Sequence, residues 1–250
     1  MQYYKELHEE LIKNRQFSAV IYAEIAYHLT RLNRIEELKK YLPGNVNTLK
    51  QLSKLLYQRD KKYSMALQIY QILYAADHDD VEVLSYLGRC YARQGNWDLV
   101  KTYFEKAIST AEQKRENTWY LYRDWGHLYV RYYMDAEAEE KFSEARRLLY
   151  QETGLKDDAG ILAAEGFLAE RNHDLNGAAE KYEAALSYNC YHEFTIQNYA
   201  NLLRKQGNIS AATKLEERLL NSNYESLGEP TDSFYSCFDI LDSGQEKDEE

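Results

Sequence analysis

The chain has 250 residues, of which 44% are hydrophobic, so it is long enough for one large or two small globular domains with a substantial core. Only 2 prolines and 11 glycines argue against an all-β chain full of tight turns, and long periodic runs of apolar and polar residues favour an all-α chain. The net charge of −10 is uneven, because residues 225–250 hold nine acids and one lysine while the rest is almost neutral.

The cysteines and the N-terminus predict a location. Cys90, Cys190 and Cys237 are odd in number and far apart in sequence, which argues against a disulfide framework and favours a reducing compartment. No apolar run approaches the roughly 20 residues that span a bilayer, and the first residues lack the apolar core of a signal peptide. We therefore expect a cytoplasmic protein without a membrane partner.

Residues 1–45 are predicted to form an N-terminal helical cap and a degenerate, half-length repeat. Tyr4, Leu7 and Leu11 lie on one narrow apolar stripe, as in a helix that covers the end of a stack. Pro43 and Gly44 then cut the following helical pattern short.

The clearest pattern lies in residues 81–112. Leu84, Leu87 and Tyr91 share one helix face, and Gly88 falls where this helix must approach a neighbour closely. A turn glycine then separates this helix from a second amphipathic helix, whose inner positions include an aromatic residue and a small one: Gly95, Phe104 and Ala107.

These positions resemble the tetratricopeptide repeat (TPR), a helix-turn-helix unit of about 34 residues. The same pattern recurs in five units, at 46–80, 81–112, 119–152, 159–192 and 193–223, followed by an acidic tail at 224–250. Tyr133 stands where a turn glycine is usual, and Glu165 and Glu216 replace large apolar residues of the pattern. The resemblance implies a right-handed α-solenoid of stacked hairpins, since one hairpin cannot bury its apolar face alone.

The resemblance also implies a binding groove lined by the first helix of each hairpin. The residues at its groove-facing positions are mostly basic, with only Glu82 and Glu170 acidic, which predicts a basic groove for an acidic or C-terminal peptide of a partner protein. The predicted groove residues are Lys50, Lys54, Arg89, Arg93, Arg123, His127, Arg131, Arg171, Asn201, Arg204 and Lys205.

Chaperone-binding TPR proteins use a carboxylate clamp of lysine, asparagine and arginine, and this clamp is incomplete here. Lys50 matches its first lysine, but Lys54 and Arg89 stand where asparagines are expected. Chaperone binding is therefore not predicted.

Three alternatives stay open. Basic residues at the ends of the first helices could simply complement the helix dipole, which accounts for Arg93, Arg131, Arg171, Arg204 and Lys205. The groove could instead bind single-stranded nucleic acid, with bases stacked on Tyr57, Tyr120 and Phe194, although the near-neutral repeats and acidic tail disfavour this. The chain could also be a sensor or oligomerisation arm of a larger complex, or form a homo-oligomer.

The sequence carries no signature of an enzyme, a cofactor or a metal site. The six histidines are scattered, and no glycine-rich phosphate loop or hydrolase motif occurs. His127 is interpreted as a polar residue of the groove, because no carboxylate at helical spacing is available to make it a general base.

The tail is predicted to be disordered in isolation, with one apolar island. Phe238, Ile240 and Leu241 lie among aspartates and resemble a short linear motif. The tail could bind a partner through this motif, mask the basic groove of its own chain, or act only as a solvating segment.

Overall fold

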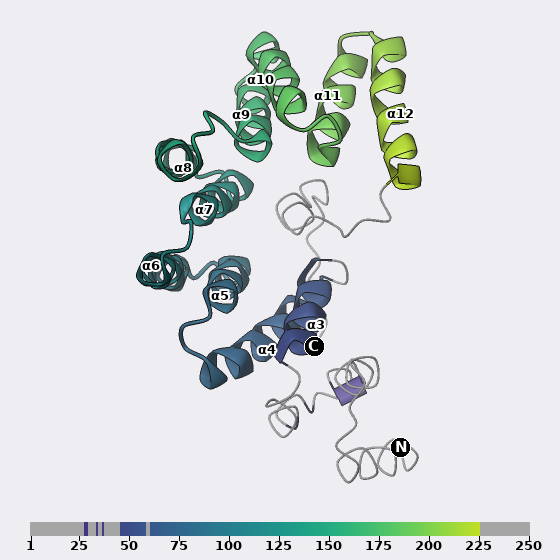
Figure 1. Cartoon of the computed structure of the whole chain (residues 1–250). Coiled ribbons are helices and arrows are strands. Elements are labelled where there is room, and N and C mark those ends of the chain that lie inside the picture. Colours follow the sequence, from purple (N-terminus) through teal and green to yellow (C-terminus); the bar gives the residue numbers. More distant parts are fainter. Residues whose placement is uncertain (1–27, 30–33, 35–36, 38–45, 59–60, 226–250) are drawn as a thin grey trace. The chain divides into compact units, whose positions relative to one another are not determined.

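The computed structural model describes residues 28–29, 34, 37, 46–58 and 61–225 (Figure 1). Two compact units divide the chain, Met1–Arg115 and Glu116–Glu250, and each is considered by itself. All regular elements in the described residues are helical. The prediction of an all-α chain built from stacked helical hairpins is confirmed, whereas the predicted N-terminal cap and acidic tail lie almost entirely outside the described residues.

The first unit contains two helical hairpins. Its helices are α3 (Val46–Gln58), α4 (Tyr63–Ala76), α5 (Val81–Arg93) and α6 (Trp97–Lys114). Helix α3 pairs with α4, α5 pairs with α6, and α4 packs against α5. Leu49, Tyr70 and Leu87 are fully buried, which shows that the apolar faces of these helices pack against one another.

The second unit contains three hairpins. Its helices are α7 (Trp119–Arg131), α8 (Asp135–Thr153), α9 (Ala159–Arg171), α10 (Leu175–Tyr188), α11 (Glu193–Lys205) and α12 (Ile209–Glu225). Beyond the contacts within each pair, α9 touches both α7 and α11, and α10 packs against α11. The first helices of this unit are therefore neighbours of one another.

A glycine in the first helix packs against an aromatic ring of the second helix in three hairpins. A Cβ atom on Gly88 would lie 2.8 Å from the Phe104 ring, and one on Gly126 would lie 2.6 Å from Phe142. The corresponding distance from Gly166 to Tyr182 is 2.7 Å. These separations leave no room for a side chain, so the close approach predicted at Gly88 is confirmed.

The turn between the two helices of each hairpin passes through a left-handed residue. Two such residues are glycines, Gly95 (φ 70°) and Gly207 (φ 82°), but the others carry side chains: Lys61 (φ 52°), Tyr133 (φ 60°) and His173 (φ 64°). Tyr133 thus adopts the backbone of the glycine whose place it takes. A residue with a Cβ is strained in this region. The backbone at Lys61, Tyr133 and His173 therefore destabilises the folded state.

The start of α7 is capped by the end of its own hairpin. The Glu152 carboxylate in α8 accepts hydrogen bonds from the Thr118 backbone N–H (2.9 Å), the Thr118 hydroxyl (2.8 Å) and the Trp119 N–H (3.3 Å). Helices α5 and α9 use a local aspartate instead: Asp80 accepts from the Val83 N–H, and Asp158 accepts from the N–H groups of Gly160 and Ile161. In both forms a carboxylate satisfies the open N–H groups at the positive end of the helix dipole.

Replacing the left-handed histidine tests the turn strain. His173→Gly should raise the free energy of unfolding by about 0.5–1 kcal/mol, because glycine adopts a positive φ without a steric penalty and His173 is exposed. Gly207→Ala, at the equivalent turn of the next hairpin, should lower it by about 1 kcal/mol. Urea unfolding followed by circular dichroism measures both, and a stability loss in His173→Gly would show that the turn is not strained.

Candidate functional site

The two predicted lysines of α3 form ion pairs with the start of α5. The Lys50 ammonium contacts Asp80 and lies 3.4 Å from Glu82, and Lys54 lies 2.6 Å from Glu82. Burial alone would lower the pKa of Lys50, but the hydrogen bond and charge of Asp80 outweigh it and raise the pKa. These lysines therefore join two neighbouring first helices within the first unit.

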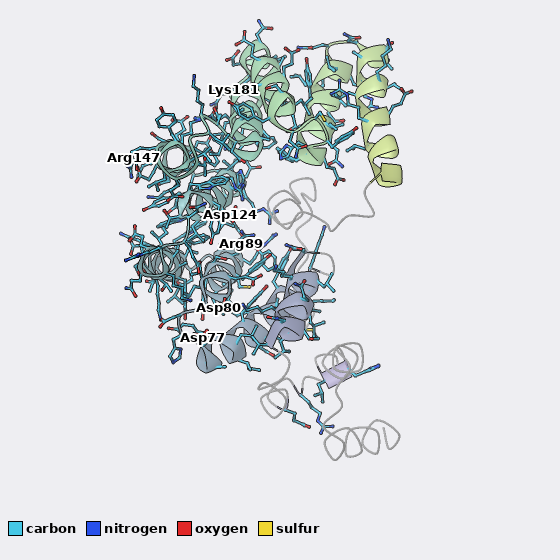
Figure 2. The ribbon with its side chains drawn as sticks, in the orientation of Figure 1. Asp77, Asp80, Arg89, Asp124, Arg147 and Lys181 are labelled. Atoms are coloured by element: carbon cyan, nitrogen blue, oxygen red, sulfur yellow. The ribbon has the colours of Figure 1, made fainter. Side chains whose placement is uncertain are left out.

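Arg89 and Arg93 lie one turn apart on α5, and their guanidinium groups stack on tyrosine rings. The Arg93 guanidinium lies 4.0 Å from the centre of the Tyr63 ring, and that of Arg89 lies 4.8 Å from the centre of the Tyr86 ring (Figure 2 labels Arg89). A guanidinium over an aromatic ring is attracted by the negative face of the ring. Arg89 is 7% exposed, and the Nε atoms of both arginines are buried. We call Arg89, Arg93, Tyr57, Tyr63 and Tyr86 the arginine–tyrosine cluster.

Two aromatic rings predicted to face the groove are instead part of the core. Tyr57 is 2% exposed, and its hydroxyl donates to the Arg89 carbonyl at 3.4 Å. Phe194 is 8% exposed and packs with Leu162, Ala163 and Ala185. The expectation that these rings offer a stacking surface for bases was wrong, because the contacts between hairpins had to be filled first.

In the second unit, Arg123 belongs to a buried polar cluster. Its guanidinium donates to Asp124 at 3.1 and 3.2 Å, lies 3.6 Å from Asp158 and stacks on Trp119 at 5.0 Å. Asp124 and Asp158 fall outside the positions counted as groove-facing in the sequence. The count that predicted an excess of basic residues therefore did not include these two acids. Two carboxylates thus face this one cation.

Two histidines complete the same cluster. His127 Nε2 lies 3.2 Å from the Gly160 carbonyl oxygen, and His192 Nδ1 contacts the Thr195 hydroxyl. Both imidazoles are buried, so His127 joins α7 to the start of α9 rather than lining an open surface. Burial, with smaller contributions from His127 and the Arg123 charge, lowers the pKa of His192 to about 3.

Three of the predicted basic residues further along the second unit, Arg171, Arg204 and Lys205, are also ion-paired. Arg171 contacts Asp135, Lys205 lies 2.7 Å from Glu170, and Arg204 donates to Glu216 at 2.6 Å. Arg171 also donates to the Val130 carbonyl, at 2.9 Å, near the end of α7. This last bond supports the expectation that some of these cations complement a helix C-terminus, although on the neighbouring helix rather than their own.

The remaining predicted residues differ in their surroundings. Asn201 is exposed on α11. Arg131, the last residue of α7, is partly buried, and its Nε and Nη1 atoms are buried without a hydrogen-bond partner among the described residues. Phe238, Ile240 and Leu241 lie outside the described residues.

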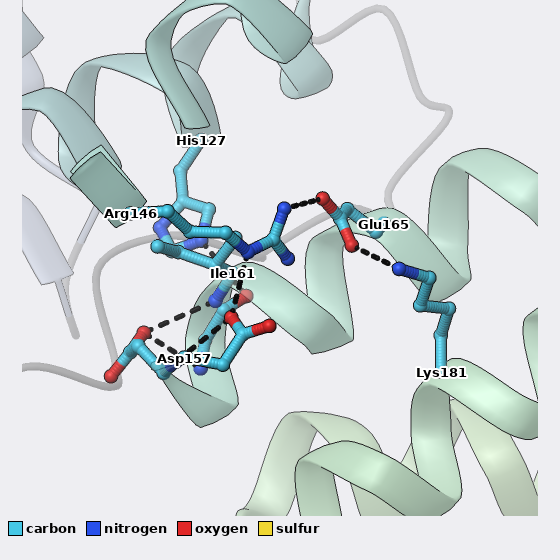
Figure 3. A network of polar contacts seen from close by, with 8 residues as sticks. His127, Arg146, Asp157, Ile161, Glu165 and Lys181 are labelled. Atoms are coloured by element: carbon cyan, nitrogen blue, oxygen red, sulfur yellow. Dashed lines mark hydrogen bonds and ion pairs between the residues drawn. The ribbon is translucent and has the colours of Figure 1, made fainter. Parts of the chain in front are cut away.

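Sequence reasoning did not identify the ion-pair network around Arg146 (Figure 3). Arg146 in α8 donates to Asp157 at 3.0 Å and to Glu165 in α9 at 2.5 Å, and Lys181 in α10 donates to Glu165 at 2.7 Å. Burial would raise the pKa of Glu165, but the hydrogen bonds from Arg146 and Lys181 outweigh it and hold the pKa below its ordinary value.

This network explains why Glu165 departs from the repeat pattern. The carboxylate links two consecutive hairpins at a place where an apolar side chain would have packed. Glu216, the second departure, likewise receives Arg204 from the first helix of its hairpin. The signal in the sequence was an acid at an apolar position, and a search for basic residues in the same and the preceding hairpin would have found the partners of Glu165.

Within the described part of the chain, no helix is long and apolar enough to cross a bilayer. In the same residues, no three His, Cys, Asp or Glu side chains are grouped so that they could hold a metal ion.

Comparison with known proteins supports the fold alone. No protein-family model matches the sequence, and no curated protein matches it. The crystal structure of BtubC (BKLC) from P. vanneervenii aligns with 86% of this chain and 95% of its own, at 16% identity and a TM-score of 0.52. A crystal structure of MamA aligns with 74% of this chain and 100% of its own, at 18% identity and a TM-score of 0.38. The fold is that of a TPR array, as the sequence resemblance implied.

Removing Glu165 tests the network between hairpins. Glu165→Ala should lower the free energy of unfolding by about 2 kcal/mol, because it leaves Arg146 partly buried without this carboxylate. Glu144→Ala, which breaks an exposed pair with Arg147 on α8, should cost less than about 0.5 kcal/mol. A cycle with Arg146→Ala measures the coupling by urea unfolding, and additive effects would show that the pair contributes nothing.

The buried histidine predicts a pH dependence of stability. The unfolded chain binds a proton at His192 near pH 6.5, whereas the folded chain does so only near pH 3. Because the unfolded state binds more protons in this window, stability falls on acidification, by about 2 kcal/mol from pH 6.5 to pH 5. His192→Gln should remove that share of the loss in urea unfolding at the two pH values. An unchanged slope in the variant would mean that another group causes the loss.

Proposed function

We propose that this protein is a non-catalytic interaction scaffold that binds an acidic or C-terminal peptide segment of a partner protein along its first helices. The proposal assigns the contact to the predicted basic residues of the first helices, and above all to Arg89 and Arg93. The TPR fold supports a role in protein interaction, since stacked hairpins present one helix from each repeat on a shared surface. Fold alone does not decide function, so the proposal depends on the cluster on α5.

The observation that carries the proposal is the arginine–tyrosine cluster. The cation–π contacts with Tyr63 and Tyr86 restrain the two guanidinium groups before any ligand arrives, which reduces the entropy lost on binding. Arginine presents paired N–H donors that match the two oxygens of a carboxylate. Arg89 and Arg93 lie four residues apart, so one extended acidic segment can meet both.

The other predicted residues would act differently. Lys50 and Lys54 already neutralise Asp80 and Glu82, so a peptide carboxylate would have to exchange with these acids. In the second unit, Arg123, Arg171, Arg204 and Lys205 face carboxylates of the protein itself. At each of these positions a peptide carboxylate would compete with an acid of the protein itself.

The proposal includes two further elements from the sequence. The acidic tail, with Phe238, Ile240 and Leu241, would compete with a partner for basic residues or bind a partner of its own. A cytoplasmic location fits the free thiols of Cys90 and Cys190. Burial raises the pKa of the Cys90 thiol to about 12, which leaves this cysteine a core residue without nucleophilic character.

Charge reversal on α5 tests the proposed function. The full chain should capture a partner from a lysate of its host, and Arg89→Glu/Arg93→Glu should reduce that capture at least tenfold, because two carboxylates would then meet the peptide acids. Lys62→Glu/Lys101→Glu is the matched control, since it makes the same charge change at exposed positions of the same unit.

Folding must be preserved in both variants, which circular dichroism checks. If Arg89→Glu unfolds the chain, Arg89→Gln/Arg93→Gln removes the positive charges and the paired guanidinium donors without adding negative charge. Undiminished capture by a folded α5 variant would exclude this mechanism.

A further inference from the structure

Four large apolar side chains are exposed where successive hairpins of the second unit are joined. Tyr150 lies in the last turn of α8 and Leu155 just after that helix, while Tyr188 ends α10 and Tyr191 lies just after it. These side chains are 48% to 61% exposed. We call the four residues the connector edge. Exposed apolar residues that gather in one place mark an interaction site more often than scattered ones do.

The connectors hold two of these residues in ordered turns. The Asn189 side-chain oxygen accepts a hydrogen bond from the Tyr191 backbone N–H at 3.1 Å, and the Thr153 hydroxyl oxygen accepts one from the Leu155 N–H at 3.1 Å. In both connectors a polar side chain thus binds the backbone two residues ahead of it. Tyr191 and Leu155 are therefore presented by the same local device.

The two connectors belong to neighbouring hairpins. Glu165 in α9 receives Arg146 from α8 and Lys181 from α10, which ties the three helices together (Figure 3). In an antiparallel hairpin the second helix begins at the turn and ends at the opposite edge. Helices α8, α10 and α12 therefore end at the edge that carries the connectors.

The last described helix, α12, brings the chain to this edge at Glu225. Helix α11 packs against both α12 and α10, and packed helices lie about 8–10 Å apart, so the axes of α10 and α12 are at most about 20 Å apart. The two helices have 14 and 17 residues, so their ends differ by about 5 Å along the axis. The 12 residues from Glu225 to Cys237 span about 40 Å when extended, which is more than this separation.

The tail carries an apolar segment of its own. Its large apolar residues all lie within residues 234–241, inside the otherwise acidic segment 226–250: Phe234, Tyr235, Phe238, Ile240 and Leu241. A segment on so short a tether has an effective concentration in the millimolar range, so even a weak contact is populated. Ser187, Asn189 and Glu193 flank the tyrosines of the connector edge, so the attraction there is apolar rather than ionic.

We propose that residues 234–241 dock on the connector edge, with Phe238 and Leu241 against Tyr188 and Tyr191. The chain's own tail is the occupant because it follows a helix that ends at this edge, is long enough to reach the tyrosines and carries apolar side chains to cover them. Only the apolar segment is assigned to this surface, and the acids on either side of it stay outside the contact. The inference does not depend on the proposed function, which assigns the partner peptide to Arg89 and Arg93.

Two cysteines make this contact measurable. Cys190 is exposed between Tyr188 and Tyr191, and Cys237 precedes Phe238. A disulfide forms only when the two Cα atoms come within about 4.4–6.8 Å, so its rate of formation reports how often the segment lies on the edge. Cys90 is buried in the core and does not compete.

The experiment oxidises the full-length chain with copper(II)–phenanthroline. The two thiols lose two protons and pass two electrons to two copper(II) ions as the S–S bond forms. Mass spectrometry of the digested, non-reduced protein measures the rate at which the Cys190–Cys237 disulfide appears.

Tyr188→Ser/Tyr191→Ser should slow this disulfide about fivefold or more, because the apolar contact that concentrates Cys237 near Cys190 is lost. The matched control is Leu175→Ser/Ile209→Ser, which removes two exposed apolar side chains at the turn edge of the same unit. The control should leave the rate within about twofold, since tethering alone is unchanged. Circular dichroism checks that both variants stay folded.

Changing the tail tests the same contact from its other side. Phe238→Ser/Leu241→Ser should slow the disulfide to a similar extent, and combining it with the tyrosine variant should slow it no further, because the two pairs act through one contact. Additive effects, or a rate that the tyrosine variant leaves unchanged, would overturn the inference. A disulfide that links only two separate molecules would assign the edge to a second copy of the chain and would also overturn it.

Discussion

The contact between a glycine of the first helix and an aromatic ring of the second sets the geometry of this protein. At Gly88, Gly126 and Gly166 a single added carbon would collide with the ring opposite. Within the second unit, where α9 touches both α7 and α11, this close approach leaves the side chains on the far side of a first helix to contact the next hairpin. The ion pairs that join α7, α9 and α11 depend on that spacing, since their side chains span only one interhelical distance.

Charge within the second unit acts mainly as a connection between repeats. Glu165 receives Arg146 from the hairpin before it and Lys181 from its own, and Lys205 reaches Glu170 on the preceding first helix. An apolar contact in the same place would be stronger per unit area but less selective for its neighbour. Ion pairs between successive hairpins instead favour one order of hairpins, because each acid needs a base at one particular position in the adjoining hairpin.

The sequence predicted the fold better than the site, for a physical reason. Gly88, Phe104 and the turn at Tyr133 are read from size and spacing within one hairpin, and these local rules held. Asp158, which faces Arg123, and Asp135, which pairs with Arg171, lie outside the helices of these arginines, and no rule for one helix locates them. Tyr57 and Phe194 were misplaced for the same reason, because burial by a neighbouring hairpin cannot be read from a single helix.

The capping of α7 by Glu152 has a consequence for how such an array can be cut and rejoined. The acid that completes the first turn of α7 sits 33 residues after Trp119, in the final turn of α8. A recombination boundary placed before Glu152 would separate the helix start from its cap, whereas one placed after Thr153 would carry both. The smallest segment that keeps α7 together with its cap therefore runs from Thr118 to Thr153, beginning one residue ahead of α7 and including the whole of α8.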